Sequence, residues 1–244
     1  MNLHRSLLTL LFILLFISSN SVWAQSTKRD DLIREIESLR SQLKVREDAL
    51  LEPSTEDRES FAEFLGQKDT GLIRLLPREE YDSKNKLTIR GGGAYFSFSR
   101  LTHEYGYGSD ISLERGNLKV GFAGACYGMM ANLGDISLND VRVEAPGVEM
   151  LASLSPPTLL PKARIEQRRS SEGIQVANTL YRSYLPVVLN STYILRSINY
   201  DSSDVLVAFR VVRKDTEGSL ILAWKMLRKG DVPKLERTAA EESQ

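Results

Sequence analysis

The stretch that decides the fold is YILRSINYDSSDVLVAFRVVRKDTEGSLILAWKML, which covers residues 193–227. It contains three runs rich in β-branched and aromatic residues, at 193–200, 205–212 and 220–227, and the connections between them are short and polar. Runs of this composition with polar turns between them are typical of antiparallel strands. The last third of the chain is therefore predicted to form an antiparallel meander.

The middle run indicates how this meander should pack. Successive side chains of a strand point to opposite faces of its sheet. Here one face carries Val205, Val207, Phe209 and Val211, and the other carries Leu206, Ala208 and Val212. A strand that is apolar on both faces is expected to be covered on both sides.

Shorter strand-like runs occur earlier in the chain. The sequence predicts strands at 87–90 and 95–100, a hairpin that pairs 111–113 with 118–122 across Arg115-Gly116-Asn117, and short strands at 136–138, 141–143 and 174–177. With the meander, about eight to ten strands are expected. The predicted fold class is mainly β: an antiparallel β-sandwich or partly closed barrel, preceded by an N-terminal α-helical, coiled-coil-like segment.

Residues 28–51 have the periodicity of an amphipathic helix. Apolar residues recur at alternating steps of four and three, with Arg46 in the one unfilled slot; they are Leu32, Ile36, Leu39, Leu43 and Leu50. This spacing predicts a coiled-coil seam of about three heptads. A helix this short is marginal alone, so we expect it to pack against a second copy, the following helix, its own domain or another envelope protein.

The segments around the predicted strands have weaker signals. Residues 54–65 should form a second helix, because Ser54 and Asp57 resemble a capping box and Gly66 suits the end. The type of the apolar run at 72–76 is left open, and 78–86 is expected to be loop. The region near 151–173, which contains Pro156, Pro157 and Pro161, is interpreted as a connection.

The first residues are typical of a secretory signal peptide. An apolar run at 7–17 follows a basic start, and Val22 and Ala24 precede the expected cleavage point. An uncleaved signal anchor is the alternative. No later stretch is long and apolar enough to span a membrane. The expected organisation is a signal peptide at 1–24, a helical segment at 25–66, a β-rich domain at 67–233 and a mobile tail at 234–244, in a periplasmic or secreted protein.

Composition excludes several classes of function. Lys plus Arg equals Asp plus Glu, at 32 each, so the chain lacks the positive charge of a general nucleic-acid or membrane-surface binder. Cys126 is the only cysteine, and no intramolecular disulfide can form. An exported protein without disulfides fits a bacterial envelope better than a disulfide-stabilised extracellular module.

Catalytic groups are scarce. After signal removal His103 is the only histidine, so no multi-histidine zinc site is expected, and neither is a metal or cofactor. Cys126 lies among small apolar residues, as buried inert thiols do. Glycines 116, 121, 124 and 128 do not have phosphate-loop spacing. Asp201 and Asp204 are explained by a turn. Whether the protein is an enzyme stays open, and the composition favours a non-enzymatic one.

One region could hold a ligand. Aromatic residues occur there near Gly91-Gly92-Gly93 and the histidine, and the candidate residues are Tyr95, His103, Tyr105, Tyr107 and Tyr127. Tyrosines among glycines can form a sugar- or peptide-binding surface. Antiparallel strands also use such residues in cross-strand pairs.

The leading functional hypothesis is an exported, non-enzymatic binding or assembly module of the bacterial envelope. A periplasmic hydrolase that works with carboxylates is the alternative, and it requires two facing acids, one with a raised pKa. A third hypothesis is a domain of a larger envelope assembly whose edge strands pair with a neighbour.

Overall fold

The computed structural model describes residues 28–103, 105–106 and 108–236, and the predicted signal peptide and the end of the predicted tail lie outside them. The chain divides into two compact units, Met1–Leu50 and Leu51–Gln244. In the first, residues 28–50 are helical, as the heptad spacing predicted, and the helix ends at residue 51. No helix within the described ranges has the length and apolar character to cross a membrane.

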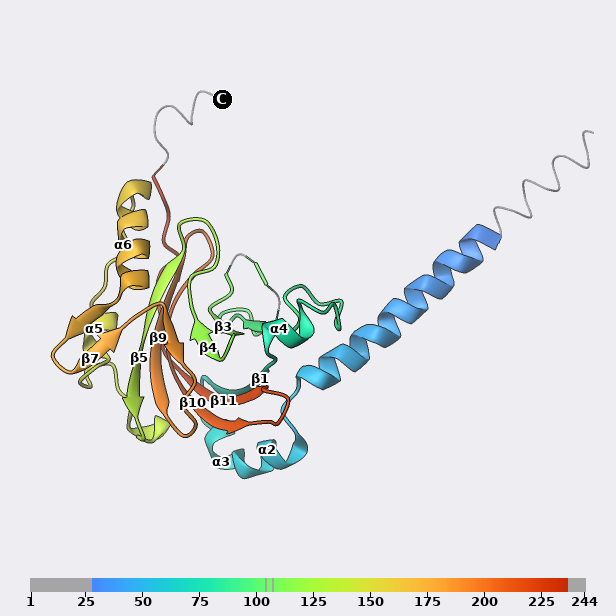
Figure 1. The fold of residues 1–244 in the computed structure, drawn as a ribbon, viewed down its shortest axis with the longest axis horizontal. Helices are drawn as coiled ribbons and strands as arrows, with labels where there is room; N and C mark the ends of the chain where they lie inside the picture. Colours follow the sequence, from blue (N-terminus) through green and yellow to red (C-terminus); the bar gives the residue numbers. More distant parts are fainter. Residues whose placement is uncertain (1–27, 104, 107, 237–244) are drawn as a thin grey trace, which may run out of the picture. The chain divides into compact units, whose positions relative to one another are not determined.

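The second unit is built on a five-stranded antiparallel sheet (Figure 1). The strand order is β1–β11–β10–β9–β5, with β1 at Thr70–Leu75, β5 at Tyr127–Gly134, β9 at Thr192–Asn199, β10 at Ser203–Lys214 and β11 at Leu220–Lys229. Strands β9, β10 and β11 are the predicted meander, which is confirmed. Strand β1 resolves the apolar run at 72–76, whose type the sequence left open.

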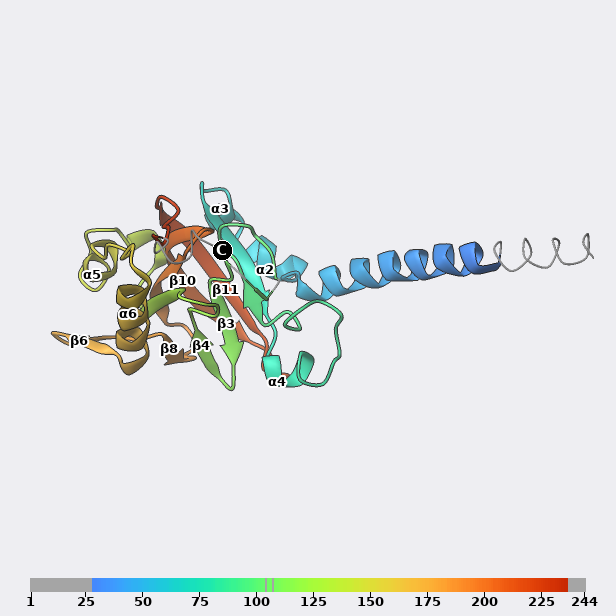
Figure 2. The ribbon, with the colours of Figure 1, turned by 90° about the horizontal axis from the view of Figure 1, so that it is seen from above.

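A second antiparallel sheet has four short strands in the order β2–β3–β4–β8. They are β2 at Tyr95–Phe96, β3 at Ile111–Glu114, β4 at Asn117–Lys119 and β8 at Tyr184–Pro186. Strands β3, β4 and β8 lie side by side in Figure 2. The predicted hairpin is confirmed, and Leu113 pairs with Leu118 in it.

Short elements complete the unit. The helices are α2 at Thr55–Ser60, α3 at Ala62–Leu65, α4 at Arg78–Tyr81, α5 at Glu149–Ala152 and α6 at Leu160–Glu172, with a 3-10 turn η1 at Leu138–Asp140. Strands β6 at Ile174–Val176 and β7 at Thr179–Tyr181 form a separate hairpin. The capping box predicted at the start of α2 is present: Ser54 and Asp57 bond to each other's backbone N–H.

The central strand β10 is covered on both faces, as its sequence predicted. One face contributes Val205, Val207, Phe209 and Val211 to a core that also contains Phe96, Ile111, Leu113, Leu118 and Leu185 of the four-stranded sheet. The opposite face contributes Leu206 and Ala208 to a second core, where Phe61, Phe64 and Leu151 pack from the helical segments. A third, smaller cluster joins Ala163 of α6 to Tyr127 and Tyr200.

Several predicted elements were wrong. Residues 87–90 form bends and turns rather than a strand, and the predicted strands at 136–143 contain the turn η1. The loop expected at 78–86 begins with α4, and the strand predicted at 95–100 is only β2. A short apolar run does not by itself identify a strand, because periodicity over so few residues is ambiguous.

Five elements were missed: β5, α5, α6, β7 and β8. Strand β5 carries Gly128, Asn132 and Gly134, and glycine and asparagine are depleted in strands. Helix α6 occupies most of the predicted connection at 151–173, and α5 precedes it. Pro161 lies in the first turn of α6, where proline is tolerated. Only Ala163 and Ser170 of this helix are buried, so it has no apolar periodicity to recognise.

Candidate functional site

The candidate site starts from the β3–β4 hairpin. A two-residue turn joins the strands, and both turn residues are left-handed, with φ of 49° at Arg115 and 71° at Gly116. This geometry fits the right-handed twist of the strands. Because Leu113 and Leu118 face the core, the alternation of side chains places Ser112, Glu114 and Lys119 on the outer face of the four-stranded sheet.

The register aligns one row of side chains across all four strands. Tyr95 of β2 pairs with Ser112 of β3, Ser112 pairs with Lys119 of β4, and Lys119 pairs with Tyr184 of β8. Directly paired residues of neighbouring strands point to the same face. A tyrosine therefore stands at each end of the row, and polar side chains occupy its middle.

Glu114 organises the charges beside this row. Its carboxylate accepts hydrogen bonds from the Tyr95 hydroxyl at 2.7 Å and the Lys119 ammonium at 2.8 Å. The Arg78 guanidinium of α4 lies 3.4 Å from the same carboxylate, and it also bonds to Asp82 at 3.1 Å. Two cations thus converge on one acid.

These contacts set the protonation states. Burial acts to raise the pKa of Glu114, but the hydrogen bonds from Lys119 and Tyr95 and the nearby positive charges outweigh it, so that the pKa lies below its ordinary value. Burial and the negative charge of Glu114 raise the pKa of Tyr95. Glu114 is consequently ionised and Tyr95 is neutral near pH 7, which leaves the pocket with one acid and two cations.

Aromatic rings form the walls at the β2 end. The Tyr105 ring lies 4.6 Å from the Tyr95 ring, and Phe122 meets Tyr95 edge-on at 5.2 Å. Arg90 lies over the Tyr105 ring at 5.0 Å. Gly91 permits this packing because a Cβ there would come within 2.6 Å of the Tyr95 ring and 2.7 Å of Tyr105.

Together these groups line a pocket of about 380 Å³, called here the outer-face pocket. Its lining residues are Arg78, Tyr95, Tyr105, Glu114, Lys119, Val120, Gly121, Phe122, Ser183 and Tyr184. Of the residues predicted as a ligand surface, Tyr95 and Tyr105 lie in it. Tyr107 lies outside the described residues.

The structure does not bring the other two predicted residues to this pocket. His103 packs its ring against Phe96 at 4.9 Å, and its Nε2 lies 2.7 Å from the backbone oxygen of Arg74 in β1. Tyr127 is buried in the cluster with Tyr200. Cys126 is fully buried.

Sequence reasoning missed Arg78, Glu114, Lys119, Phe122 and Tyr184. Two of them, Glu114 and Lys119, could have been found from the predicted hairpin. If its apolar residues point inward, these two side chains point outward and lie close together. Tyr184 had none, since it depends on the pairing of β4 with β8 across a long stretch of chain.

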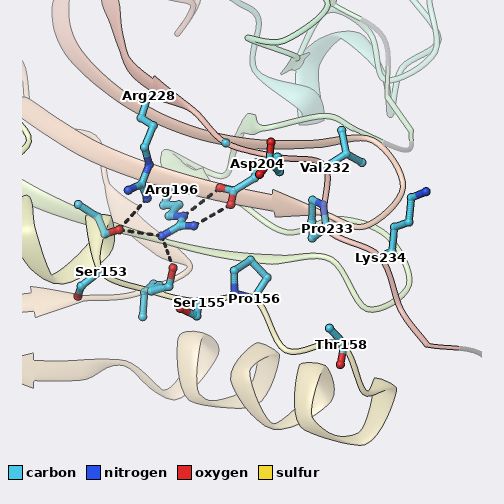
Figure 3. A pocket seen from close by; sticks show the side chains of 14 residues that line it. Ser153, Ser155, Pro156, Thr158, Arg196, Asp204, Arg228, Val232, Pro233 and Lys234 are labelled. Atoms are coloured by element: carbon cyan, nitrogen blue, oxygen red, sulfur yellow. Dashed lines mark hydrogen bonds and ion pairs between the residues drawn. The ribbon is translucent and has the colours of Figure 1, made fainter.

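A second pocket, of about 480 Å³, lies between the 152–158 segment and the 230–234 segment. Figure 3 shows Arg196 among its lining residues, with Asp204 on one side and backbone carbonyls on the other. Arg196 bonds to both Asp204 oxygens, at 2.9 and 2.7 Å, and to the carbonyls of Leu151 and Leu154, at 2.8 and 2.6 Å. Its guanidinium is thus engaged in holding the 151–154 segment in place, and we interpret this pocket as structural.

One described acid has the raised pKa that a carboxylate-dependent hydrolase requires. Burial raises the pKa of Asp110 to about 6, although hydrogen bonds from Ser197, Phe98 and neighbouring groups oppose the change. Asp110 is fully buried, however, and it accepts hydrogen bonds from Asn199 and the Phe98 backbone at 2.8 Å each. It lines neither pocket, and Glu114 is the one acid among the described residues of the outer-face pocket.

The helix at 28–50 carries the second candidate surface. The five predicted oligomerisation residues, called here the helix seam, are between 37% and 57% exposed. Ion pairs join Asp31 to Arg34 and Lys44 to Asp48. These four residues occupy the outer b, c and f positions of the heptad, away from the helix seam.

Within the described ranges no group of three or more His, Cys, Asp or Glu side chains is placed to hold a metal ion. No family model, curated protein sequence or solved structure matches the chain. The geometry of its residues therefore carries the functional argument.

Proposed function

We propose that this is an exported, non-enzymatic assembly and binding module of the bacterial envelope, in which the helix at 28–50 pairs with a second copy of itself as a parallel coiled coil. The single observation that carries the proposal is the exposed helix seam. Five large apolar side chains recur at coiled-coil spacing and are each more than a third exposed. Pairing would remove them from water, at about 25 cal/mol for each Å² of apolar surface.

The residues at the seam favour two parallel strands. The 4–3 spacing places Leu32 and Leu39 at d positions and Ile36 at an a position. A β-branched residue at a with leucine at d is the combination that favours parallel dimers. Leu43 and Leu50 occupy the following a positions and are not β-branched, so Ile36 carries this preference.

Charges beside the seam support the same orientation. Glu35 falls at a g position, and Arg40 falls at the following e position. In a parallel pair, the g residue of one helix lies beside the next e residue of the other. Glu35 of each copy would therefore meet Arg40 of its partner, twice by symmetry.

Arg46 fits this arrangement as a specificity residue. It occupies a d position, where a parallel pair would bring two guanidinium groups together. A polar residue at one core position weakens a coiled coil but limits the registers and oligomeric states that it can adopt. The proposed dimer is accordingly of moderate affinity.

Two further parts of the proposal concern architecture and location. The two antiparallel sheets share one apolar core, which supports the description of the second unit as a β-sandwich. Export is supported by the signal-like sequence at 1–24. N-terminal sequencing of the protein from the periplasmic fraction of an expressing bacterium should find Gln25 first, and a start at Met1 would contradict cleavage.

Sedimentation equilibrium of the exported protein tests the pairing. We expect a monomer–dimer equilibrium that Leu39→Lys shifts to monomer, because the change places a charge in the seam. Val45→Lys is the matched control, since Val45 lies at an outer c position and is 68% exposed. A monomeric wild type, or equal dimerisation of Leu39→Lys, would contradict the proposal.

A further inference from the structure

We propose that the outer-face pocket binds an acidic oligosaccharide, meaning a glycan whose sugar rings carry carboxylate groups. This is a second function, located in the β-rich unit, and it does not rest on self-association of the helix. The aligned row on the four-stranded sheet, with aromatic rings at its two ends and charged groups between them, carries the inference.

The dimensions of the row suit an extended ligand. Tyr105 and Phe122 flank the buried Tyr95 at the β2 end, and the exposed ring of Tyr184 stands at the β8 end. Three inter-strand steps separate these ends, which gives about 14 Å. The pocket volume of about 380 Å³ lies within the range of small-molecule sites. The row is therefore long enough for more than one sugar ring.

The lining offers partners for both the apolar C–H faces and the polar hydroxyl groups of a sugar. The C–H faces of a sugar ring pack on aromatic faces, whose π-systems carry partial negative charge. Its hydroxyl groups form hydrogen bonds, and those to charged side chains are the strongest. Tyr105, Phe122 and Tyr184 offer the aromatic surfaces, and Lys119 and Glu114 offer charged partners between them. The guanidinium of Arg182 lies over the Tyr184 ring, 4.0 Å from its centroid.

The charge of the pocket selects acidic sugars. Arg78 and Lys119 line it with Glu114, and their side chains are 42% and 38% exposed, compared with 14% for the glutamate. Asp82, which does not line the pocket, pairs with Arg78 at 3.1 Å and balances its charge. Arg90 adds a further positive charge over Tyr105. A ligand carboxylate would therefore meet accessible cations, while the negative charge of Glu114 is covered by its own partners.

The same face is poorly suited to a peptide. Extended peptides bind sheets by adding a strand to an exposed edge, where backbone groups supply the hydrogen bonds. Here the row crosses the face of the sheet, and the backbones of β3 and β4 are paired on both sides. The pocket consequently presents side chains, and a ligand rich in hydroxyl groups fits them better.

Isothermal titration calorimetry of the full exported protein tests this assignment. The probes are trigalacturonate as the acidic glycan, maltotriose as a neutral one and tetraglutamate as an acidic peptide. We expect trigalacturonate to bind at least about tenfold more tightly than either of the others. Tyr184→Ala should weaken its binding about tenfold or more through loss of a stacking surface, and Lys119→Gln should do the same through loss of a charge-assisted hydrogen bond.

Two control variants separate the pocket from the general surface. Leu189→Ala removes an exposed apolar side chain outside the pocket, and Lys229→Gln removes an exposed lysine at the end of β11. Both should bind trigalacturonate as the wild type does. The proposal is overturned if trigalacturonate does not bind, if tetraglutamate or maltotriose binds equally well, or if Tyr184→Ala and Lys119→Gln, confirmed as folded by circular dichroism, bind unchanged.

Discussion

The single residue Asp110 contributes a pH-dependent part of the stability of the protein. Its carboxyl group is enclosed between the two sheets, and burial raises its pKa from the ordinary 3.8 to about 6. The folded state therefore binds this proton more tightly than the unfolded state does. The resulting stabilisation is complete below about pH 4 and is lost as the pH rises through about 6.

We expect the free energy of unfolding to fall by up to about 3 kcal/mol between about pH 4 and pH 7 through this group alone. Asp110→Asn, which cannot ionise, should remove that part of the pH dependence. Urea unfolding of both proteins across this range measures it, with the exposed Asp231→Asn as control. Parallel curves for wild type and Asp110→Asn would contradict the assignment.

Arg196 is a residue whose loss should cost much of the stability of the fold. Its side chain and that of Asp204 are 4% and 6% exposed, and they form a two-bond ion pair beside the 151–154 segment (Figure 3). Removing one partner of a buried pair leaves the other charge buried and unpaired. Arg196→Ala should therefore lower the free energy of unfolding by about 3–5 kcal/mol.

Arg210 provides the matched control for this prediction. It also pairs with an aspartate, but the Asp135 side chain is 81% exposed. The Arg210 side chain is 22% exposed and also bonds to the Ile136 carbonyl oxygen and Thr192 Oγ1. Arg210→Ala should still cost less than Arg196→Ala, because the Asp135 carboxylate is solvated before and after the change. Urea unfolding of the two variants compares them directly, and similar losses would mean that burial does not set the cost.

At the scale of single elements, one substitution in the helix is expected to strengthen the proposed dimer rather than weaken it. Arg46→Leu would fill the one polar slot of the helix seam and remove two facing positive charges from the proposed dimer. We expect the dimerisation constant to rise by about tenfold or more. Arg34→Leu, at an outer f position, should leave it unchanged. Sedimentation equilibrium measures both, and equal or weaker pairing of Arg46→Leu would contradict a parallel coiled coil.

The elements that could be predicted from sequence share a physical property. Strand β10 and the helix at 28–51 carry periodic apolar residues over many positions, and the β3–β4 turn carries a glycine where a left-handed conformation is needed. Helix α6 and strand β5 lack these signals. Helix α6 exposes most of its length, and β5 contains residues that strands rarely use. Tertiary packing therefore determines these two elements more than local sequence does.

At the scale of the whole molecule, the candidate site was predictable only in part for the same reason. Local sequence indicated Tyr95 and Tyr105 because they lie near the glycines at 91–93, of which Gly91 makes room for both tyrosines. The pocket also requires α4, the 120–122 segment and β8, which long-range pairing brings to one sheet face. His103 and Tyr127 are close to the site in sequence, but they belong to other packing environments.

Disulfide cross-linking of the exported protein tests the proposed parallel pairing most directly. Cys126 is fully buried, so one introduced cysteine can report on the helix. Leu32→Cys lies at a d position near one end, where only a parallel pair brings the two copies together. Arg34→Cys, two residues later, points outward. Under mild oxidation we predict a covalent dimer for Leu32→Cys and little for Arg34→Cys; equal cross-linking of both, or none for Leu32→Cys, would contradict the parallel coiled coil.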